Sequence, residues 1–262
     1  IEAVSLAILI VVCAVPEGLP LMISLVLMQN TSKMLDHNVL VRKAVGIETA
    51  GSLNILFSDK TGTITKGSLE VVEFFTSDGT NIPLSDIKAH GKVKSLVDIA
   101  IGKNTASMFD GEHRVIGGNA TDQALLKFLG EDEFNFLTKG DGKDIEYSVG
   151  MSQGFNSANK FSQVEIRELN QVFYKGAPER LLASAKKGLD KEGNVIELVP
   201  EVVENKINEY ASRAMRVLAF GYSEKTFTEN KINDDVVIIG LVAIRDDVRP
   251  EAKEAIKEVQ DA

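Results

Sequence analysis

Apolar residues cluster in a few runs along the chain, and the longest run lies at its beginning. Residues 3–15 are apolar except for Ser5, and residues 21–28 continue the run after a short interruption. As one helix, residues 3–28 would be roughly 39 Å long at about 1.5 Å per residue, whereas the hydrocarbon core of a bilayer is roughly 30 Å thick. The pattern therefore predicts one N-terminal transmembrane helix.

Shorter apolar runs farther along the chain predict buried strands. Residues 54–58 and residues 236–243 have the composition of strands that are buried on both faces, and the aromatic run 172–174 predicts another strand. Residues 67–235 depart from the alternation of strands and helices that an α/β domain shows. We therefore predict that one domain is inserted into another.

Composition and charge narrow the classes of function. The 262 residues are 44% hydrophobic and 26% charged, which is ordinary for a folded protein with room for more than one domain. The net charge of -9 argues against a nucleic-acid partner, because a phosphate-binding face needs clustered Lys and Arg. The single cysteine, Cys13, cannot form an internal disulfide, and the three histidines lack metal-ligand spacing. We expect a reducing compartment and no zinc site.

Basic residues after the predicted transmembrane helix indicate its orientation. Lys33, Arg42 and Lys43 follow the helix, and the cytosolic ends of membrane helices carry an excess of Lys and Arg. The segment also lacks the basic start and the small-residue cleavage site of a signal peptide. We therefore expect a membrane protein whose residues after about 30 lie in the cytosol.

The segment Pro16-Glu17-Gly18-Leu19-Pro20 interrupts the predicted transmembrane helix. Each proline removes a backbone donor, so main-chain carbonyl groups just before the break lose their helical partners and become available to a cation. Glu17 supplies a negative charge, and carboxylate and carbonyl oxygens suit a hard cation such as calcium. The alternative is a proline kink whose glutamate pairs with a neighbouring helix.

The segment Asp59-Lys60-Thr61-Gly62-Thr63-Ile64-Thr65 follows directly after the predicted strand 54–58. A carboxylate at the C-terminal end of a buried strand lies where open α/β sheets bind ligands, and the neighbouring Lys, Gly and Thr can hold phosphate oxygens. This arrangement predicts a site for phosphoryl transfer. The alternative is an ordinary polar turn, which Asp, Thr and Gly also favour.

The segment 59–65 resembles the phosphorylation loop of the P-type ion-pumping ATPases. The resemblance implies that ATP phosphorylates Asp59 and that Lys60, Thr61 and Thr63 complete the catalytic group. It also implies that magnesium is held by the Asp59 carboxylate, the Thr61 main-chain carbonyl and a downstream aspartate.

The break at residues 16–20 resembles the fourth transmembrane helix of the calcium-transporting members of this family. The resemblance implies a site for transported calcium. Its ligands would be the Glu17 carboxylate and the main-chain carbonyl groups of Val12, Cys13 and Val15.

Four segments of the insert, residues 118–125, 155–160, 175–179 and 214–219, resemble the nucleotide-binding motifs of the family in the family's order. The resemblance implies an acid near the adenine amino group, an aromatic ring stacked on adenine, and cations that approach the nucleotide. The implied contacts are Asp122, Phe155, Lys160, Lys175, Gly176 and Arg216. Residues 245–250 resemble the family's hinge, in which Asp246 and Arg249 match and Asp247 and Val248 replace two prolines. We also expect Asp246 and Arg249 among the nucleotide contacts.

The fold class implied by the resemblance is α/β. A haloacid-dehalogenase-like (Rossmann-like) phosphorylation domain, incomplete here, would be split by an α+β nucleotide-binding domain with an antiparallel sheet, and strands on both sides of the insert would belong to one parallel sheet. The expected parts are a transmembrane helix (residues 1–30), a stalk and the first part of the phosphorylation domain (31–66), the nucleotide-binding domain (67–235) and the hinge return with the second part of the phosphorylation domain (236–262). We expect the chain to be an internal fragment of the pump.

The expected function is ATP-driven transport of calcium across a membrane through an aspartyl-phosphate intermediate. ATP, magnesium, the transported calcium, the lipid bilayer and the remainder of the same pump are the expected cofactors and partners. The alternatives are a P-type pump for sodium and potassium or for protons, a soluble phosphatase or phosphomutase with an aspartate nucleophile, and a non-catalytic nucleotide-binding module. We expect the fragment alone to bind nucleotide without completing the cycle.

Overall fold

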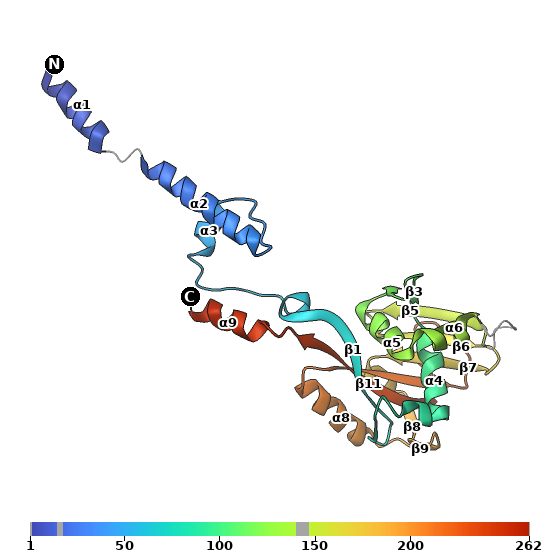
Figure 1. Ribbon diagram of the computed structural model, residues 1–262. Helices are drawn as coiled ribbons and strands as arrows, with labels where there is room; N and C mark the ends of the chain where they lie inside the picture. The colour runs from blue at the N-terminus through green and yellow to red at the C-terminus, as the bar shows by residue number, and fades with distance from the viewer. Residues whose placement is uncertain (1, 15–17, 140–146, 262) are drawn as a thin grey trace. The chain divides into compact units, whose positions relative to one another are not determined.

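The computed structural model describes residues 2–14, 18–139 and 147–261 (Figure 1). The chain divides into two units, Ile1–Ser58 and Asp59–Ala262, and each unit is described by itself below.

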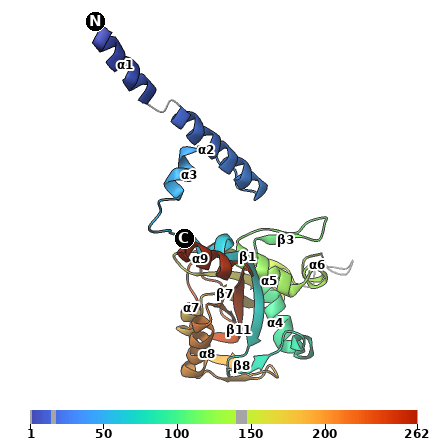
Figure 2. The same cartoon turned by 60° about the vertical axis from the view of Figure 1, so that its left-hand side comes forward.

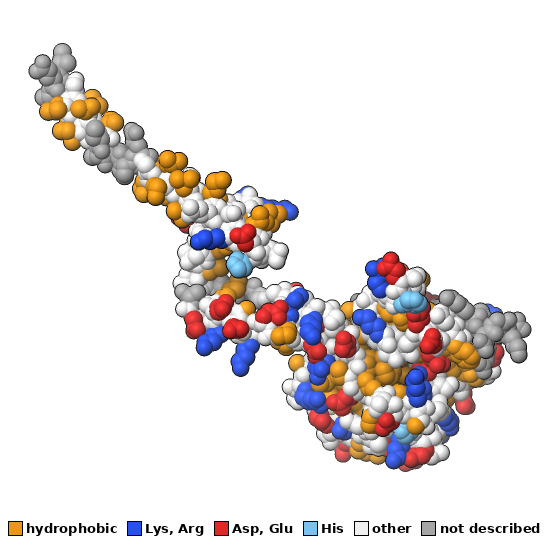
Figure 3. Space-filling model, viewed as in Figure 1, with side chains coloured by type: hydrophobic (Ala, Val, Ile, Leu, Met, Phe, Trp, Pro, Cys, Tyr) orange, Lys and Arg blue, Asp and Glu red, His pale blue; other side chains and the backbone are white. Residues whose placement is uncertain are grey.

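The first unit consists of the helices α1 (Glu2–Ala14), α2 (Gly18–Asp36) and α3 (Val45–Ala50). Hydrophobic side chains are exposed along α1 and along the first half of α2 (Figure 3). Among the described residues, no helix has both the length and the apolar character that crossing a membrane requires. The prediction of a transmembrane helix is therefore not confirmed. Val15 and Glu17 of the predicted calcium site lie outside the described residues.

The apolar segment 54–58 was predicted as a buried strand, and this prediction is wrong for the described structure. Residues 54–58 have no strand conformation, and Ile55, Leu56 and Phe57 are exposed, with Phe57 at 92%. None of the described strands pairs with this segment. Because a buried strand requires neighbours that supply its ladder hydrogen bonds, the apolar composition alone is insufficient to produce one.

The second unit is built around a nine-stranded sheet. Its main path runs in the order β2-β1-β11-β10-β7-β6-β5, and β8 pairs with β11 and with β9. The strands are β1 (Thr65–Phe75), β2 (Asn81–Ile82), β5 (Val149–Asn156), β6 (Phe161–Ile166), β7 (Gln171–Gly176), β8 (Ala185–Leu189), β9 (Val195–Glu197), β10 (Arg216–Ser223) and β11 (Val236–Val248). A separate hairpin joins β3 (Ser107–Phe109) to β4 (Val115–Gly117). The prediction of an antiparallel sheet is confirmed, since among the described strands only the pair β8 and β11 is parallel.

The position of β11 corrects the prediction for residues 236–243. We expected this run to leave the insert and enter a parallel sheet, but β11 pairs antiparallel with both β1 and β10 at the centre of the insert's own sheet. A run of apolar residues indicates a strand buried on both faces, and this condition is met in a covered antiparallel sheet as well as in a parallel one. The sheet therefore extends from Thr65 to Val248, beyond the predicted limits of 67 and 235.

Helices cover both faces of this sheet. They are α4 (Gly91–Gly102), α5 (Ala120–Leu129), α6 (Glu131–Lys139), α7 (Pro178–Leu182) and α8 (Pro200–Ser212); α9 (Ala252–Asp261) follows the last strand, and the short turns η1 (Lys60–Ile64) and η2 (Ile87–Ala89) complete the unit. Figure 2 shows α4 and α5 on one side of the sheet and α7 and α8 on the other.

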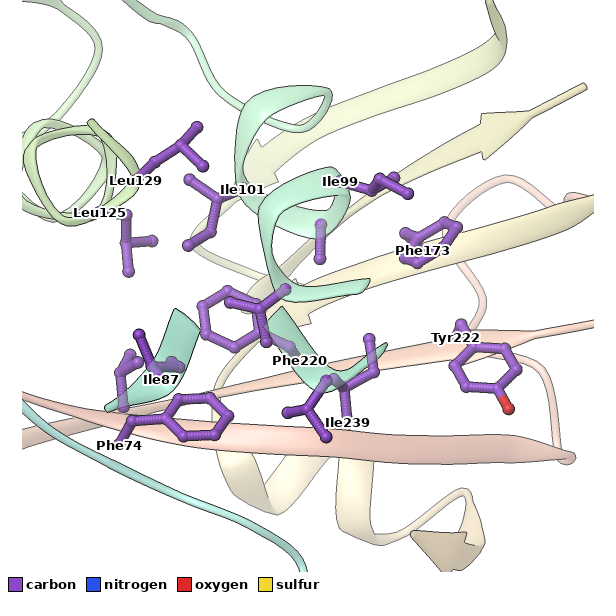
Figure 4. Packing of buried hydrophobic residues seen from close by; sticks show 14 of the residues in the cluster. Phe74, Ile87, Ile99, Ile101, Leu125, Leu129, Phe173, Phe220, Tyr222 and Ile239 are labelled. Carbon is purple, nitrogen blue, oxygen red and sulfur yellow. The ribbon is translucent and has the colours of Figure 1, made fainter. Parts of the chain in front are cut away.

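Two hydrophobic clusters correspond to these two faces. Successive strand residues point to opposite faces, so Phe74 belongs to the cluster under α4 and α5, and Phe75 belongs to the cluster under α7 and α8. In β7, Phe173 lies in the first cluster and Tyr174 in the second. Figure 4 shows how Phe74, Phe173 and Phe220 meet side chains from α4 and α5 in the first cluster. Alternation of side chains, interrupted by irregularities in the pairing of β1 and β11, thus produces a three-layer unit.

One charged residue lies beneath the helical layer of the first face. Asp98 of α4 is 3% exposed and forms an ion pair with Lys94 one turn earlier. Its Oδ1 atom is buried and has no hydrogen-bond partner among the described residues. Burial raises the pKa of Asp98 to about 6, against the opposing effect of Lys94, and the charge of Glu133 raises it further. The folded state therefore favours the protonated carboxyl group.

We predict that Asp98→Asn stabilises the chain near neutral pH. The pKa of Asp98 is higher in the folded state than in the unfolded state. The stability that comes from the protonated carboxyl is therefore fully present below the unfolded-state pKa of 3.8 and is lost as pH rises toward about 6. The substitution should add up to about 3 kcal/mol to the free energy of unfolding at pH about 7.5, and much less at pH about 4. Urea unfolding at the two pH values measures the difference, with the exposed Asp132→Asn as the control. An equal increase in the free energy of unfolding at both pH values would contradict a raised pKa of Asp98.

Candidate functional site

A cavity of about 620 Å³ opens on the second unit where α5, β7 and β10 meet. Its walls come from the first turn of α5, the end of β5, the β5–β6 turn, the end of β7, the start of α7 and the start of β10. The lining residues are Asn119, Ala120, Thr121, Asp122, Phe155, Lys160, Lys175, Gly176, Ala177, Glu179, Arg216, Val217 and Leu218.

The first turn of α5 is directed into this cavity by a local capping arrangement. Asn119 is the N-cap of α5, and its Oδ1 accepts a hydrogen bond from the main-chain N–H of Asp122 at 2.9 Å. Gly118 precedes the cap with a φ of 60°, and a Cβ at this position would lie 2.3 Å from Ser107 Oγ. Only glycine therefore allows the chain to pass the β3–β4 hairpin and begin α5 at this place.

A buried ion pair between Asp122 and Lys175 forms part of the wall. Lys175 Nζ lies 2.6 Å from Asp122 Oδ1, and the two side chains are 5% and 8% exposed. Lys175 also donates a hydrogen bond to the main-chain oxygen of Asn104, and Asp122 Oδ2 accepts one from Asn119 Nδ2. Burial lowers the pKa of Lys175, while the Asp122 carboxylate opposes that change. The pair places an acceptor and a donor side by side in a nearly buried part of the wall.

The strand pairing of β6 and β7 fixes the end of β7 in the cavity. Gly176 pairs with Phe161, and a Cβ on Gly176 would lie 2.6 Å from Phe161 Cβ and 2.7 Å from Lys160 O. Ala177 N–H donates to Lys160 O at 2.9 Å, and Pro178 then begins α7. The Lys-Gly-Ala-Pro segment therefore ends the β6–β7 pairing and begins α7, in addition to lining the cavity.

The rim of the cavity carries an aromatic ring and two cations. Phe155 is 52% exposed although its ring is apolar. Lys160 Nζ lies 3.2 Å from Glu179 Oε1, and Arg216 Nη1 donates to Thr121 Oγ1 at 3.1 Å. An exposed ring beside a buried acid–lysine pair can hold a planar heterocycle, and the exposed cations can bind anionic groups attached to it.

The predicted phosphorylation loop forms an exposed turn. It contains Lys60, Thr61 and Thr63 and follows Asp59, which is also exposed. Gly62 has a φ of 81°, which glycine adopts without strain.

Asp246 and Arg249 hold this turn rather than line the cavity. Asp246 Oδ2 accepts a hydrogen bond from Thr65 Oγ1 at 2.6 Å, and its Oδ1 accepts one from Gly67 N–H at 3.0 Å. Arg249 donates from its main chain to Ile64 O at 2.9 Å and from its guanidinium group to the main-chain oxygens of Thr65 and Gly62. Both were predicted among the nucleotide contacts, and here they tie the two connections of the insert together.

The structure thus groups the predicted residues into separate sets. Six of them line the one cavity, namely Asp122, Phe155, Lys160, Lys175, Gly176 and Arg216. Val12 and Cys13 lie in α1. Among the described residues, no group of three or more His, Cys, Asp or Glu side chains forms a metal site.

Asn104, Asn119 and Thr121 contact the predicted residues but were missed by the sequence analysis. The Asn-x-x-Asp spacing of residues 119–122 is a cap signal that could have identified Asn119. Thr121 lies between recognised positions, whereas Asn104 contacts Lys175 through its main chain and carries no sequence signal.

Comparison with known proteins identifies the class to which this fold and site belong. A family model described as P-type ATPase, cytoplasmic domain N, matches residues 92–251, which includes all six cavity residues. The chain belongs to the P-type ATPase family.

Individual relatives align with nearly the whole chain. A putative calcium-transporting ATPase 13, plasma membrane-type, from Arabidopsis thaliana is 32% identical over 99% of this chain and 26% of its own length. The calcium-transporting ATPase PAT1 of Dictyostelium discoideum is 34% identical over 98% of this chain and 24% of its own length. Calcium-transporting ATPase 1 of Saccharomyces cerevisiae is 30% identical over 99% of this chain and 30% of its own length. The chain spans about a quarter of the length of these relatives.

We predict that Lys175→Met lowers the free energy of unfolding by about 3–5 kcal/mol, because it leaves the buried Asp122 carboxylate without its cation. Adding Asp122→Asn should recover part of this loss, so the two substitutions will be strongly non-additive. A double-mutant cycle by urea unfolding measures the coupling. Lys160→Met, which removes the exposed pair with Glu179, is the control and should cost no more than about 1 kcal/mol. Additive effects of the two buried substitutions would refute the idea that the Asp122 carboxylate depends on the Lys175 cation.

Proposed function

We propose that the chain binds ATP in the cavity and is part of a pump that uses ATP to transport calcium through phosphorylation of Asp59. The observation that carries the proposal is the convergence of six predicted nucleotide contacts, from four separate sequence segments, on one cavity of about 620 Å³. This volume is within the usual range for a small-molecule site. The relatives are named as calcium-transporting ATPases, which supports the transport of calcium.

In the proposed complex, the adenine ring stacks on Phe155 and its amino group donates a hydrogen bond to Asp122. Stacking suits an exposed ring at the rim, and the buried carboxylate supplies orientation. Lys160 and Arg216 lie at the rim as well, where their charges can bind the phosphate groups. Gly176 keeps the end of β7 close to β6 and so holds Lys175 in the wall of the site.

The proposed chemistry is nucleophilic attack by an Asp59 carboxylate oxygen on the γ-phosphorus of ATP. The bond between this oxygen and phosphorus forms while the bond between the γ-phosphorus and the bridging oxygen breaks, and the electron pair leaves with ADP. Lys60 and Thr63 offset and orient the charge on the phosphoryl oxygens. Mg²⁺ would be held by the Asp59 carboxylate and the Thr61 main-chain oxygen, donors that suit this cation, and would offset further negative charge.

We further propose that the segment before Thr65 and helix α9 belong to a haloacid-dehalogenase-like phosphorylation domain. Ile55, Leu56 and Phe57 are exposed before the turn, and Ile256 and Val259 are exposed on α9. Such side chains are expected where an apolar segment packs against further parts of a domain. The contacts of Asp246 and Arg249 would then form the hinge between this domain and the nucleotide-binding sheet, which must move to bring ATP to Asp59.

The transmembrane and calcium-binding assignments are part of the same proposal. The exposed apolar side chains of α1 and α2 suit a lipid environment or neighbouring membrane helices. Glu17 and the main-chain oxygens of Val12, Cys13 and Val15 would bind calcium, and the second unit would lie in the cytosol.

We predict that the chain binds ATP and that Phe155→Ala weakens binding about tenfold, because stacking of a base on an aromatic ring contributes about 1–3 kcal/mol. Isothermal titration calorimetry measures the dissociation constant. Phe136→Ala removes an exposed phenylalanine of α6 that is outside the cavity, and it should leave the affinity unchanged. Failure of the wild-type chain to bind ATP, or equal effects of both substitutions, would contradict the site.

We predict that the whole pump carrying this chain forms an acid-stable phosphoenzyme from γ-labelled ATP, that the label requires calcium, and that Asp59→Asn abolishes it. The amide of asparagine cannot form the acyl phosphate. Gel autoradiography after acid quenching provides the measurement. Label without calcium would assign the pump to another cation, and absence of label in the wild-type pump would leave a nucleotide-binding module.

A further inference from the structure

A smaller cavity, of about 130 Å³, lies against the wall of the nucleotide cavity. Asp122, Phe155 and Lys175 line both cavities. The smaller cavity is additionally lined by Asn104, which the sequence analysis did not single out. The acid–lysine pair therefore has a further polar neighbour in the smaller cavity.

Asn104 follows the C-terminal end of α4. Its main-chain N–H donates to Ile101 O at 3.2 Å, and its main-chain oxygen accepts the hydrogen bond from Lys175 Nζ. The lysine ammonium thus lies at the negative end of a helix, which favours a buried cation. The backbone of Asn104 is fixed by this contact, and only its side chain remains adjustable.

The side-chain amide of Asn104 has an unusual environment. The residue is 8% exposed, and its Nδ2 atom is buried without a hydrogen-bond partner among the described residues. An unpaired buried donor costs about 1–3 kcal/mol, so most such donors in proteins are paired. The terminal torsion of asparagine is soft, and a rotation about it can turn the donor toward a group that enters the site.

We propose that Asn104 is a specificity-determining residue of the nucleotide site, whose side-chain amide donates a hydrogen bond to the adenine ring nitrogen beside the amino group. The inference rests on the proposed binding of ATP. An acceptor from Asp122 and a donor from Asn104 match the adenine edge, which presents an amino donor next to a ring-nitrogen acceptor. A 6-oxopurine presents the reverse order, an oxygen acceptor next to an N–H donor, and leaves both protein groups mismatched.

The test compares the affinities of ATP, inosine triphosphate and 1-deaza-ATP for the wild-type chain and for Asn104→Ala, by calorimetry. We expect wild type to bind ATP at least tenfold more tightly than either analogue, because each analogue lacks the ring acceptor. In Asn104→Ala, ATP should weaken about tenfold and the analogues less than threefold. The unfolding temperature without nucleotide should not fall, because the substitution removes an unpaired donor. Asn194→Ala, in an exposed turn, is the matched control and should change no affinity.

Each contrary result has a distinct meaning. If wild type fails to bind ATP, the proposed function and this inference both fail. If wild type binds ATP and 1-deaza-ATP equally, the Asn104 amide does not contact the ring nitrogen. This result overturns the inference whatever the Asn104→Ala variant does. If Asn104→Ala lowers the unfolding temperature and weakens all three ligands equally, Asn104 is only a structural support for Lys175, and the inference is overturned while ATP binding stands.

Discussion

The antiparallel pairing of β1 with β11 is the constraint on which the second unit depends. The two strands enter and leave the insert, so their pairing from Thr65 with Val248 to Phe75 with Leu241 closes more than 160 residues into one loop. Helices α4, α5, α7 and α8 all contact strands of the sheet to which this pair belongs. The same pairing assigns alternate side chains to opposite faces, so that one strand contributes to both hydrophobic clusters. The pairing of β1 with β11 therefore both organises the sheet and brings together the two segments through which the chain enters and leaves it.

The proposed nucleotide site combines this rigid support with polar groups that are costly to bury. Lys175 is placed by a central strand and Asp122 by the first turn of a capped helix, so their contact joins α5 to the sheet. A buried pair of this kind contributes little net stability when intact, but loss of either partner leaves an uncompensated charge. The pair is thus better explained by what it offers to a ligand than by what it contributes to folding. The exposed Phe155 and the unpaired Asn104 amide in the same region support this interpretation.

In the proposed hinge, hydrogen bonds stand where the family usually has the rigid backbone of two prolines. Asp247 and Val248 occupy positions where the family usually has prolines, so the backbone there lacks the fixed φ of proline. Asp246 and Arg249 on either side bind the main chain of the turn after Asp59, and these bonds hold the two connections together. Hydrogen bonds of this kind can break and form again, which suits the proposed hinge.

The sequence by itself determined the family and six of the residues that line the cavity, because glycine turns, caps and charged residues at set spacings have local physical requirements. Lys175, Gly176 and Asp122 could be identified in this way. The sequence could not determine whether residues 236–243 joined a parallel or an antiparallel sheet, since burial on both faces produces the same composition in each. It also could not reveal Asn104, whose contact with Lys175 runs through a main-chain oxygen that every residue possesses. Only the tertiary structure decided these points, because strand partners and main-chain acceptors are chosen by the packing of segments that are distant in sequence.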